Sequence, residues 1–334
     1  MSSPLTINSF CVVVGSHISN PKRIPYLIEC LISLVRQTIP IAIHVSMSFA
    51  EPEIKTQTID AIMSNAELVA ANRIQIRLRE EKTPQMRHIE HLVNELQGIH
   101  EWIMFCDDDD TYEPTRASKF ASSIAKGVQE VEEMNVAITN PSDKKILFGL
   151  YESSFGKNHR EHRHEYWCYC SHINTLKTFY EKLAPYPDIL DDKCCDVLYA
   201  EHLRRAGENK LFIRIQEKLY NYRVENNSDS ITGVIQTNQP KYTILKPAPP
   251  REQVQEWADY IVYWNGYLYE NMQVYIHDTY LRALVGCEFD YILRNEFLAN
   301  YPLMEFVDAC HVEGLRAYYD RLRDICNIIY DIKI

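Results

Sequence analysis

The amino-terminal part of the chain alternates between short apolar runs and longer stretches with apolar residues at helical spacing. The short runs predict strands at residues 10–15, 41–46, 73–79 and 102–106. The longer stretches predict helices at residues 21–37, 51–63 and 85–96. Strands that alternate with helices need crossover connections, and these make neighbouring strands parallel. The pattern therefore predicts an α/β fold, with a mostly parallel sheet flanked by helices.

The composition changes in the second half of the chain. Residues 233–250 are polar and end in the sequence KPAPP, which is typical of a linker or a wrapping arm. Residues 251–334 are rich in Tyr, Leu and Ile and are predicted to be mainly helical. We therefore expect a first domain at 1–232, a linker at 233–250 and a helical C-terminal extension at 251–334, whose helices offer a surface for homo-oligomers.

Composition also narrows the function classes and the compartment. The net charge of −11 argues against a nucleic-acid binder, which would carry a basic surface. The sequence has no recognisable secretory signal and no apolar window of the roughly 20 residues that a transmembrane segment needs. The ten cysteines are scattered and several lie in apolar runs, where free thiols pack as small hydrophobes. We expect a cytoplasmic protein with reduced thiols.

Four consecutive carboxylates, Asp107 to Asp110, follow the predicted strand at 102–106. Ligands of open α/β sheets bind beyond the carboxyl ends of the strands, which is where this acidic run should lie. Adjacent carboxylates raise one another's pKa unless a cation offsets the repulsion. Mg²⁺ binds carboxylate and substrate phosphate oxygens together. We therefore expect Asp107 and Asp109 to serve a metal or a phosphate, and Asp110 to cap the following helix.

The sequence lacks the motifs that are typical of dinucleotide-dependent dehydrogenases and of P-loop proteins. The first predicted strand is not followed by GxGxxG or by a Walker A lysine loop. The loop that does follow it, GSHISNPKR, has few glycines and ends in two basic residues.

Four stretches, in order, resemble one enzyme family. They are YLIECLISLVRQTIP, IMFCDDDDTYEPTR, CDVLYAEHLRRAG and EKLYNYRVENNSDSIT. Together they make residues 1–232 resemble the GT-A glycosyltransferases, family 2 in particular. The resemblance implies the Rossmann-like GT-A fold of nucleotide-diphospho-sugar transferases. The second stretch resembles the DXD motif of that family, and the third resembles its later "ED" helix.

The resemblance also implies roles for single residues. Asp107 would contact the nucleotide, and Asp109, together with Asp107, would bind Mn²⁺ or Mg²⁺. Asp196 would be the catalytic base of an inverting reaction, with Asp191 and Asp192 as alternatives. Expected donor-binding residues are Gly15, Ser16, Ser46, Gln85, His88, Asp107 and Asp108. Tyr166 and Trp167 are the expected acceptor-binding residues, because aromatic rings can stack on sugars.

The sequence therefore predicts a hexosyl- or pentosyltransferase of glycan biosynthesis. It would move a sugar from a nucleotide donor, with UDP-sugars expected, to a hydroxyl of a glycan or glycoconjugate. Residues 46–48 stand where the family usually has an aspartate that binds uracil, so the sequence leaves the nucleobase of the donor undetermined. One alternative is a nucleotidyltransferase that makes sugar nucleotides, although GSHISNPKR supplies the basic loop of that class poorly. The other is a non-catalytic sugar- or protein-binding module on a decayed transferase fold.

Overall fold

The chain divides into two compact units, Met1–Asn227 and Ser228–Ile334. A computed structural model describes the segments that follow. They are residues 10–133, 149–152, 165–192, 195–208, 212–215, 217–223, 249–250, 252–263, 288–291 and 309–331. The predicted domain boundary near residue 232 and most of the predicted linker lie outside these segments, so both stay predictions.

The first unit is built on a seven-stranded sheet with the order β3-β2-β1-β4-β7-β6-β8. Its strands are β1 (Phe10–Ile18), β2 (Ala42–Phe49), β3 (Ile74–Leu78), β4 (Trp102–Phe105), β6 (Gly149–Glu152), β7 (Tyr169–His172) and β8 (Phe212–Ile215). Strands β3, β2, β1 and β4 run parallel, and so do β6 and β8. Strand β7 runs antiparallel to both of its neighbours, β4 and β6. The predicted mostly parallel α/β sheet is confirmed.

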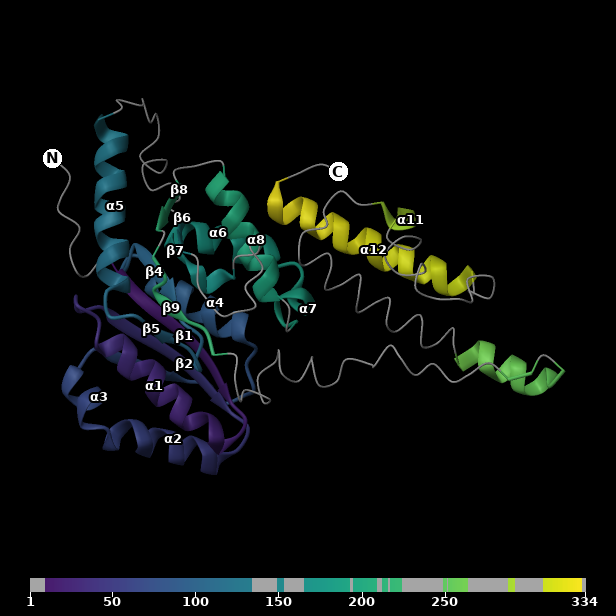
Figure 1. The fold of residues 1–334 in the computed structure, drawn as a ribbon, viewed down its shortest axis with the longest axis horizontal. Coiled ribbons are helices and arrows are strands. Elements are labelled where there is room, and N and C mark those ends of the chain that lie inside the picture. Colours follow the sequence, from purple (N-terminus) through teal and green to yellow (C-terminus); the bar gives the residue numbers. More distant parts are fainter. Residues whose placement is uncertain are drawn as a thin grey trace. The chain divides into compact units, whose positions relative to one another are not determined.

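Helices cover both faces of this sheet. Helices α1 (Ile24–Val35), α2 (Pro52–Ser64) and α3 (Ala66–Ala71) lie along one side, whereas α4 (Gln85–Leu96), α6 (Ile173–Leu183) and α8 (Cys195–Glu208) lie along the other (Figure 1). The remaining helices of this unit are η2 (Pro21–Arg23), α5 (Arg116–Glu133), η4 (Tyr166–Cys168) and α7 (Pro187–Leu190). The apolar stripes of α1 and α4 are buried, so helical periodicity located both core faces correctly.

A glycine lets α4 rest directly on the central strand. A Cβ atom at Gly15 would lie 2.9 Å from His88 Cβ and 3.2 Å from the Gln85 carbonyl oxygen, too close for any other residue without a shift of the helix. This close approach brings the first turn of α4, with Gln85 and His88, against the end of β1.

A second, two-stranded sheet lies beside the first. Strand β5 (Thr111–Tyr112) pairs antiparallel with β9 (Tyr220–Asn221), and Tyr112 is opposite Tyr220. The sequence TYEP at 111–114, with a proline suited to the first turn of a helix, predicts a turn into a helix. That prediction is wrong for Thr111 and Tyr112. They form a strand because their pairing partner lies about a hundred positions later, beyond the reach of local pattern.

Two predicted boundaries also differ. The sequence predicts a helix at 196–206 that is closed by Gly207, whereas α8 begins at Cys195 and continues through Gly207 to Glu208. The sequence also predicts a strand at 145–151; β6 covers Gly149–Glu152, and residues 145–148 lie outside the described segments.

The described parts of the second unit are helical. They comprise a helix that includes residues 254–263, the short α11 (Phe289–Tyr291) and α12 (Ala309–Tyr330). In the first, Trp257 and Tyr260 stack with ring centroids 5.5 Å apart. The sequence predicts that these two rings belong to an aromatic stripe at helical spacing that continues to Leu268; residues 264–268 lie outside the described segments. No helix among the described residues is long and apolar enough to cross a membrane.

Candidate functional site

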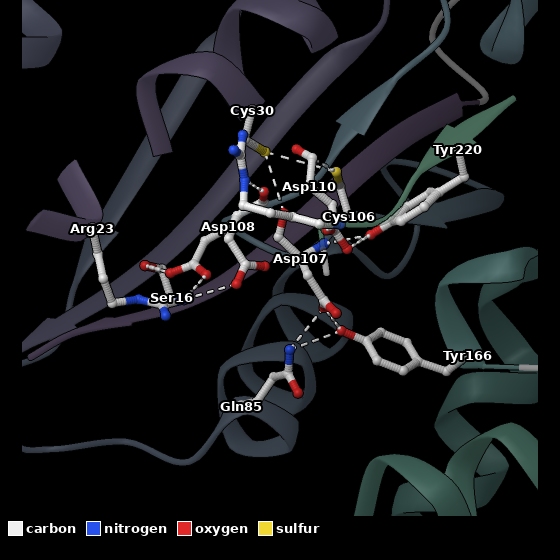
Figure 2. A network of polar contacts seen from close by, with 12 residues as sticks. Ser16, Arg23, Cys30, Gln85, Cys106, Asp107, Asp108, Asp110, Tyr166 and Tyr220 are labelled. Atoms are coloured by element: carbon white, nitrogen blue, oxygen red, sulfur yellow. Dashed lines mark hydrogen bonds and ion pairs between the residues drawn. The ribbon is translucent and has the colours of Figure 1, made fainter. Parts of the chain in front are cut away.

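The acidic run lies where the sheet topology favours ligand binding. Strands β2 and β3 follow β1 on one side, and the chain then returns to place β4 on the other side of β1. In open α/β sheets ligands bind at such a switch point, just beyond the carboxyl ends of the strands. Asp107 to Asp110 follow β4 directly, and Ser16 of β1 and Gln85 of α4 reach the same place (Figure 2).

Asp107 is held by two neutral donors through one oxygen only. Gln85 Nε2 donates to Asp107 Oδ1 at 2.8 Å, and the Tyr166 hydroxyl donates to the same oxygen (Figure 2). None of the described residues donates a hydrogen bond to the other oxygen, Oδ2. Burial and the nearby charge of Asp109 raise the pKa of Asp107 well above its usual range. An added cation would therefore find one oriented carboxylate oxygen at this position.

Asp108 has both oxygens engaged. Ser16 Oγ donates to its Oδ2 at 2.5 Å, and the Arg23 guanidinium donates to its Oδ1 at 2.9 Å. The same Arg23 nitrogen lies 3.3 Å from Asp109 Oδ2. Burial raises the pKa of Asp108, while Arg23 opposes that rise. The loop GSHISNPKR therefore brings positive charge to the acidic run through Arg23.

Asp110 anchors strand β9 instead of capping a helix. The Tyr220 hydroxyl donates to Asp110 Oδ2 at 2.8 Å, and the backbone N–H of Arg223 donates to Oδ1 at 2.7 Å. The side chain is 1% exposed, and burial raises its pKa well above the usual range. The predicted helix cap is wrong, because α5 begins only at Arg116 and both Asp110 oxygens are already used.

Two buried thiols lie beneath the acidic run. Cys30 Sγ and Cys106 Sγ are 3.7 Å apart (Figure 2). They donate to the carbonyl oxygens of Asp107, at 3.4 Å, and Asp110, at 3.8 Å. The cysteines that the structure describes are free, and those of this pair pack α1 against the acidic run.

Asp196, one of the three candidate bases, lies in the first turn of α8. Burial is the main cause that raises the pKa of Asp107 and of Tyr166, and the charge of Asp196 adds to the rise in both. Asp191 instead accepts from Arg87 Nε at 2.6 Å and is 50% exposed. Asp192 follows it at the end of the short helix α7. The assignment of the base remains a prediction, and this geometry favours Asp196.

Ser46 and His88 form a buried polar pair. His88 Nδ1 is 2.8 Å from Ser46 Oγ, and its Nε2 is 3.0 Å from Ser48 Oγ, which in turn contacts His17 Nδ1 at 2.9 Å. Burial lowers the pKa of His88 to about 3, so the ring is neutral. Of these four side chains only His17 is partly exposed. Of the predicted donor-binding residues Ser46 and His88, neither is open to solvent, whereas the neighbouring His17 is accessible to a ligand.

The predicted acceptor aromatics are both buried. Tyr166 is used to hold Asp107, and Trp167 stacks on Tyr220 and Tyr222 at centroid distances of 4.1 and 5.5 Å. Tyr222 is 37% exposed and is the ring of this stack that reaches solvent. Their acceptor role stays a prediction, and Tyr222 joins them as a candidate that the sequence reasoning missed.

The sequence reasoning also missed three polar partners of the acidic run. They are Arg23, Tyr220 and Arg223. Tyr220 and Arg223 lie in EKLYNYRVENNSDSIT, one of the stretches that resemble the family. That resemblance could have pointed to them, but no residue of this stretch was assigned a role. Arg23 had no such signal, because only the fold brings the end of its loop to Asp108.

A second cluster with metal-ligand residue types lies in the core. Cys11, His44 and His100 are all buried, and their ligand atoms lie within 4.8 Å of one another. Arg77 Nη1 is 3.1 Å from His44 Nδ1, and His44 Nε2 is 3.0 Å from His100 Nε2. Because arginine only donates, His44 Nδ1 accepts and its Nε2 carries the proton. That tautomer explains the histidine pair as a hydrogen bond and leaves His44 no lone pair for a metal.

Comparison with known proteins gives distant structural similarity only. No protein-family model matches the sequence, and no curated protein matches it. TarS from S. aureus is similar with 11% identity and a TM-score of 0.46, over 95% of this chain and 55% of TarS. TarS 1–349 in complex with UDP-GlcNAc is similar with 12% identity and a TM-score of 0.43, over 95% of this chain and 90% of that one.

A further similar structure is the mannosyltransferase PcManGT from Pyrobaculum calidifontis, in complex with GDP-Man and Mn²⁺. It has 11% identity and a TM-score of 0.42, over 98% of this chain and 86% of that one. This chain spans little more than half the length of the full TarS chain. At these values the function must be argued from the site itself.

Proposed function

We propose that this chain is a metal-dependent, inverting glycosyltransferase with a GT-A catalytic domain and a nucleotide-sugar donor. The observation that carries the proposal is the arrangement of Asp107. It stands at the switch point of the sheet, with one oxygen fixed by Gln85 and Tyr166 and the other left to a ligand. Such an arrangement suits a cation whose remaining ligands come from the substrate.

The residues present fit a hard divalent ion. Asp107 and Asp109 offer carboxylate oxygens. Burial and the charge of Asp109 raise the pKa of Asp107, and a bound cation would oppose that rise. Mg²⁺ in particular is held by one or two carboxylates plus substrate phosphates, so a complete protein cage is not needed. When bound, Mn²⁺ or Mg²⁺ would stabilise the negative charge of the leaving diphosphate.

The side chains of this chain then divide the work of transfer. Gln85 and Tyr166 keep Asp107 in one orientation, and Ser16 does the same for Asp108. Asp196 accepts the proton of the acceptor hydroxyl as that oxygen bonds to the anomeric carbon and the bond to the diphosphate breaks. Tyr222 would stack on the acceptor, and its exposed ring, backed by the buried Trp167, supports this role.

The donor can be identified by thermal shift against UDP-, GDP-, dTDP- and CMP-sugars, each with and without Mn²⁺. A ligand at about 100 times its dissociation constant adds roughly 2.7 kcal/mol to the free energy of unfolding, which raises the melting temperature clearly. We expect a UDP-sugar to give such a shift only when Mn²⁺ is present. A shift of equal size without metal would refute the role given to Asp107 and Asp109.

Product analysis separates the proposal from its two alternatives. A glycosyltransferase releases a nucleoside diphosphate from the sugar nucleotide, whereas a nucleotidyltransferase releases pyrophosphate from a nucleoside triphosphate. A binding module would show a metal-dependent shift with no turnover of any donor. We expect release of the nucleoside diphosphate, by transfer or by slow hydrolysis.

A further inference from the structure

The guanidinium of Arg23 supplies positive charge beside the acidic run, where a metal ion is also proposed to bind. It approaches Asp108 Oδ1 at 2.9 Å and Asp109 Oδ2 at 3.3 Å with the same nitrogen, and the side chains of all three residues are only 11% exposed (Figure 2). The position of the arginine is set locally. Asn20 caps the short helix η2 through the backbone N–H of Lys22 at 3.0 Å, and Pro21 starts that helix.

Arg223, the second arginine near the acidic run, makes different contacts. Arg223 Nε donates to the backbone carbonyl of Asp109 at 2.8 Å, and its guanidinium pairs with Glu29 and lies 4.4 Å from the ring centroid of Tyr26. It therefore clamps the backbone of the acidic run, whereas Arg23 faces the carboxylates. Asp109 is a proposed metal ligand, so Arg23 and a divalent ion would compete for the same carboxylate group.

Resting on the proposed function, we propose that Arg23 is a diphosphate-binding residue of the donor site and that Asp108 is its tether. In the donor-free protein Arg23 partly neutralises Asp108 and Asp109. When metal and donor bind, it gives up Asp109 and donates to the donor phosphate. A guanidinium suits this exchange because its planar fork of donors matches phosphate as well as carboxylate oxygens. Ser16 keeps Asp108 in place by a separate oxygen throughout.

The exchange predicts effects of opposite sign on two ligands, which a purely structural role would not produce. In Arg23→Gln, Mn²⁺ without nucleotide should bind roughly two- to fivefold more tightly, because a competing ion pair is gone. At saturating Mn²⁺, UDP and pyrophosphate should bind roughly ten- to a hundredfold more weakly, because a charge-assisted hydrogen bond to phosphate is lost. Arg23→Lys should lie between, since it keeps the charge and loses the fork.

Mn²⁺ binding is measured by electron paramagnetic resonance, and nucleotide and pyrophosphate binding by calorimetry on the full chain. Arg36→Gln is the matched control, because the Arg36 side chain forms an exposed ion pair with Glu67 and takes no part in the described contacts of the acidic run, so it should leave both affinities unchanged. If both affinities fall together in Arg23→Gln and Arg23→Lys, or if neither changes, Arg23 only supports the acidic run and the inference is wrong. If the unaltered protein binds neither UDP nor pyrophosphate with Mn²⁺, the proposed function fails as well.

Discussion

The hydroxyl of Tyr220 donates to Asp110 Oδ2 at 2.8 Å, across 110 positions of sequence. The same hydroxyl accepts from the backbone N–H of Asp107 at 3.0 Å, so one side chain fixes both ends of the acidic run. Its ring is buried and stacks on Trp167 at 4.1 Å. The conformation of the acidic run therefore depends on strand β9, which lies more than a hundred positions later in the sequence.

Tyr220→Phe removes both of these hydrogen bonds while keeping the ring. We expect the free energy of unfolding to fall by about 1–3 kcal/mol, because a buried carboxylate and a backbone N–H lose a partner. Transfer activity should fall as well, because the orientation of Asp107 is loosened. Urea unfolding measures the first effect and donor turnover the second. Tyr180→Phe is the control, since it removes one buried hydroxyl, bonded to the Met86 carbonyl oxygen, and should spare activity.

Asp109→Asn and Asp196→Asn should separate donor binding from proton transfer. We expect both to impair transfer severely. Asp109→Asn should also remove the Mn²⁺-dependent part of donor binding, whereas Asp196→Asn should keep it and lower kcat by roughly 10²–10⁴, the usual contribution of a general base. Calorimetry and turnover give the two readings. Asp191→Asn breaks only the half-exposed pair with Arg87 and should stay active; its inactivation would move the base to Asp191.

Tyr166→Phe should shift the pH dependence of metal binding. The hydrogen bond from the Tyr166 hydroxyl lowers the pKa of Asp107, against the larger opposing effect of burial. Without it the pKa of Asp107 rises further, so protons compete with Mn²⁺ up to a higher pH. We expect the curve of Mn²⁺ affinity against pH to move to higher pH, with little change on its alkaline plateau. An unshifted curve would show that Asp107 is not a metal ligand.

Asp107→Asn should stabilise the metal-free protein at neutral pH. The folded pKa of Asp107 is raised above its ordinary value of 3.8, so its contribution to stability is present below that value and is lost as pH rises through the folded pKa. The asparagine cannot ionise, and its carbonyl can still accept from Gln85 and Tyr166. We expect the melting temperature of the variant, relative to the unaltered protein, to increase as the pH is raised from 4 upwards.

Added Mn²⁺ provides the control for that comparison. It should raise the melting temperature of the unaltered protein at neutral pH and leave Asp107→Asn almost unchanged, because the variant lacks the charged ligand. A relative stability that does not depend on pH would mean that Asp107 has the same pKa in the folded and in the unfolded protein.

Much of the fold could be predicted because it depends on local periodicity. The apolar runs at β1, β2 and β4 and the stripes of α1 and α4 identified strands and helices, and their alternation predicted the parallel sheet. The position of the acidic run at the end of β4 followed from the same pattern. The short strands β5 and β9 could not be predicted in this way, because two-residue segments carry no period and gain their structure only by pairing.

The sequence by itself determined which residues form the acidic run and where along the sheet they lie. Only the tertiary structure decided what each aspartate does, because their chemistry depends on partners from distant segments. Asp108 faces Arg23 from the loop after β1, Asp107 faces Gln85 and Tyr166, and Asp110 faces Tyr220. Four identical side chains in a row differ only in these contacts, and contacts between distant segments are made by packing, which no local pattern records.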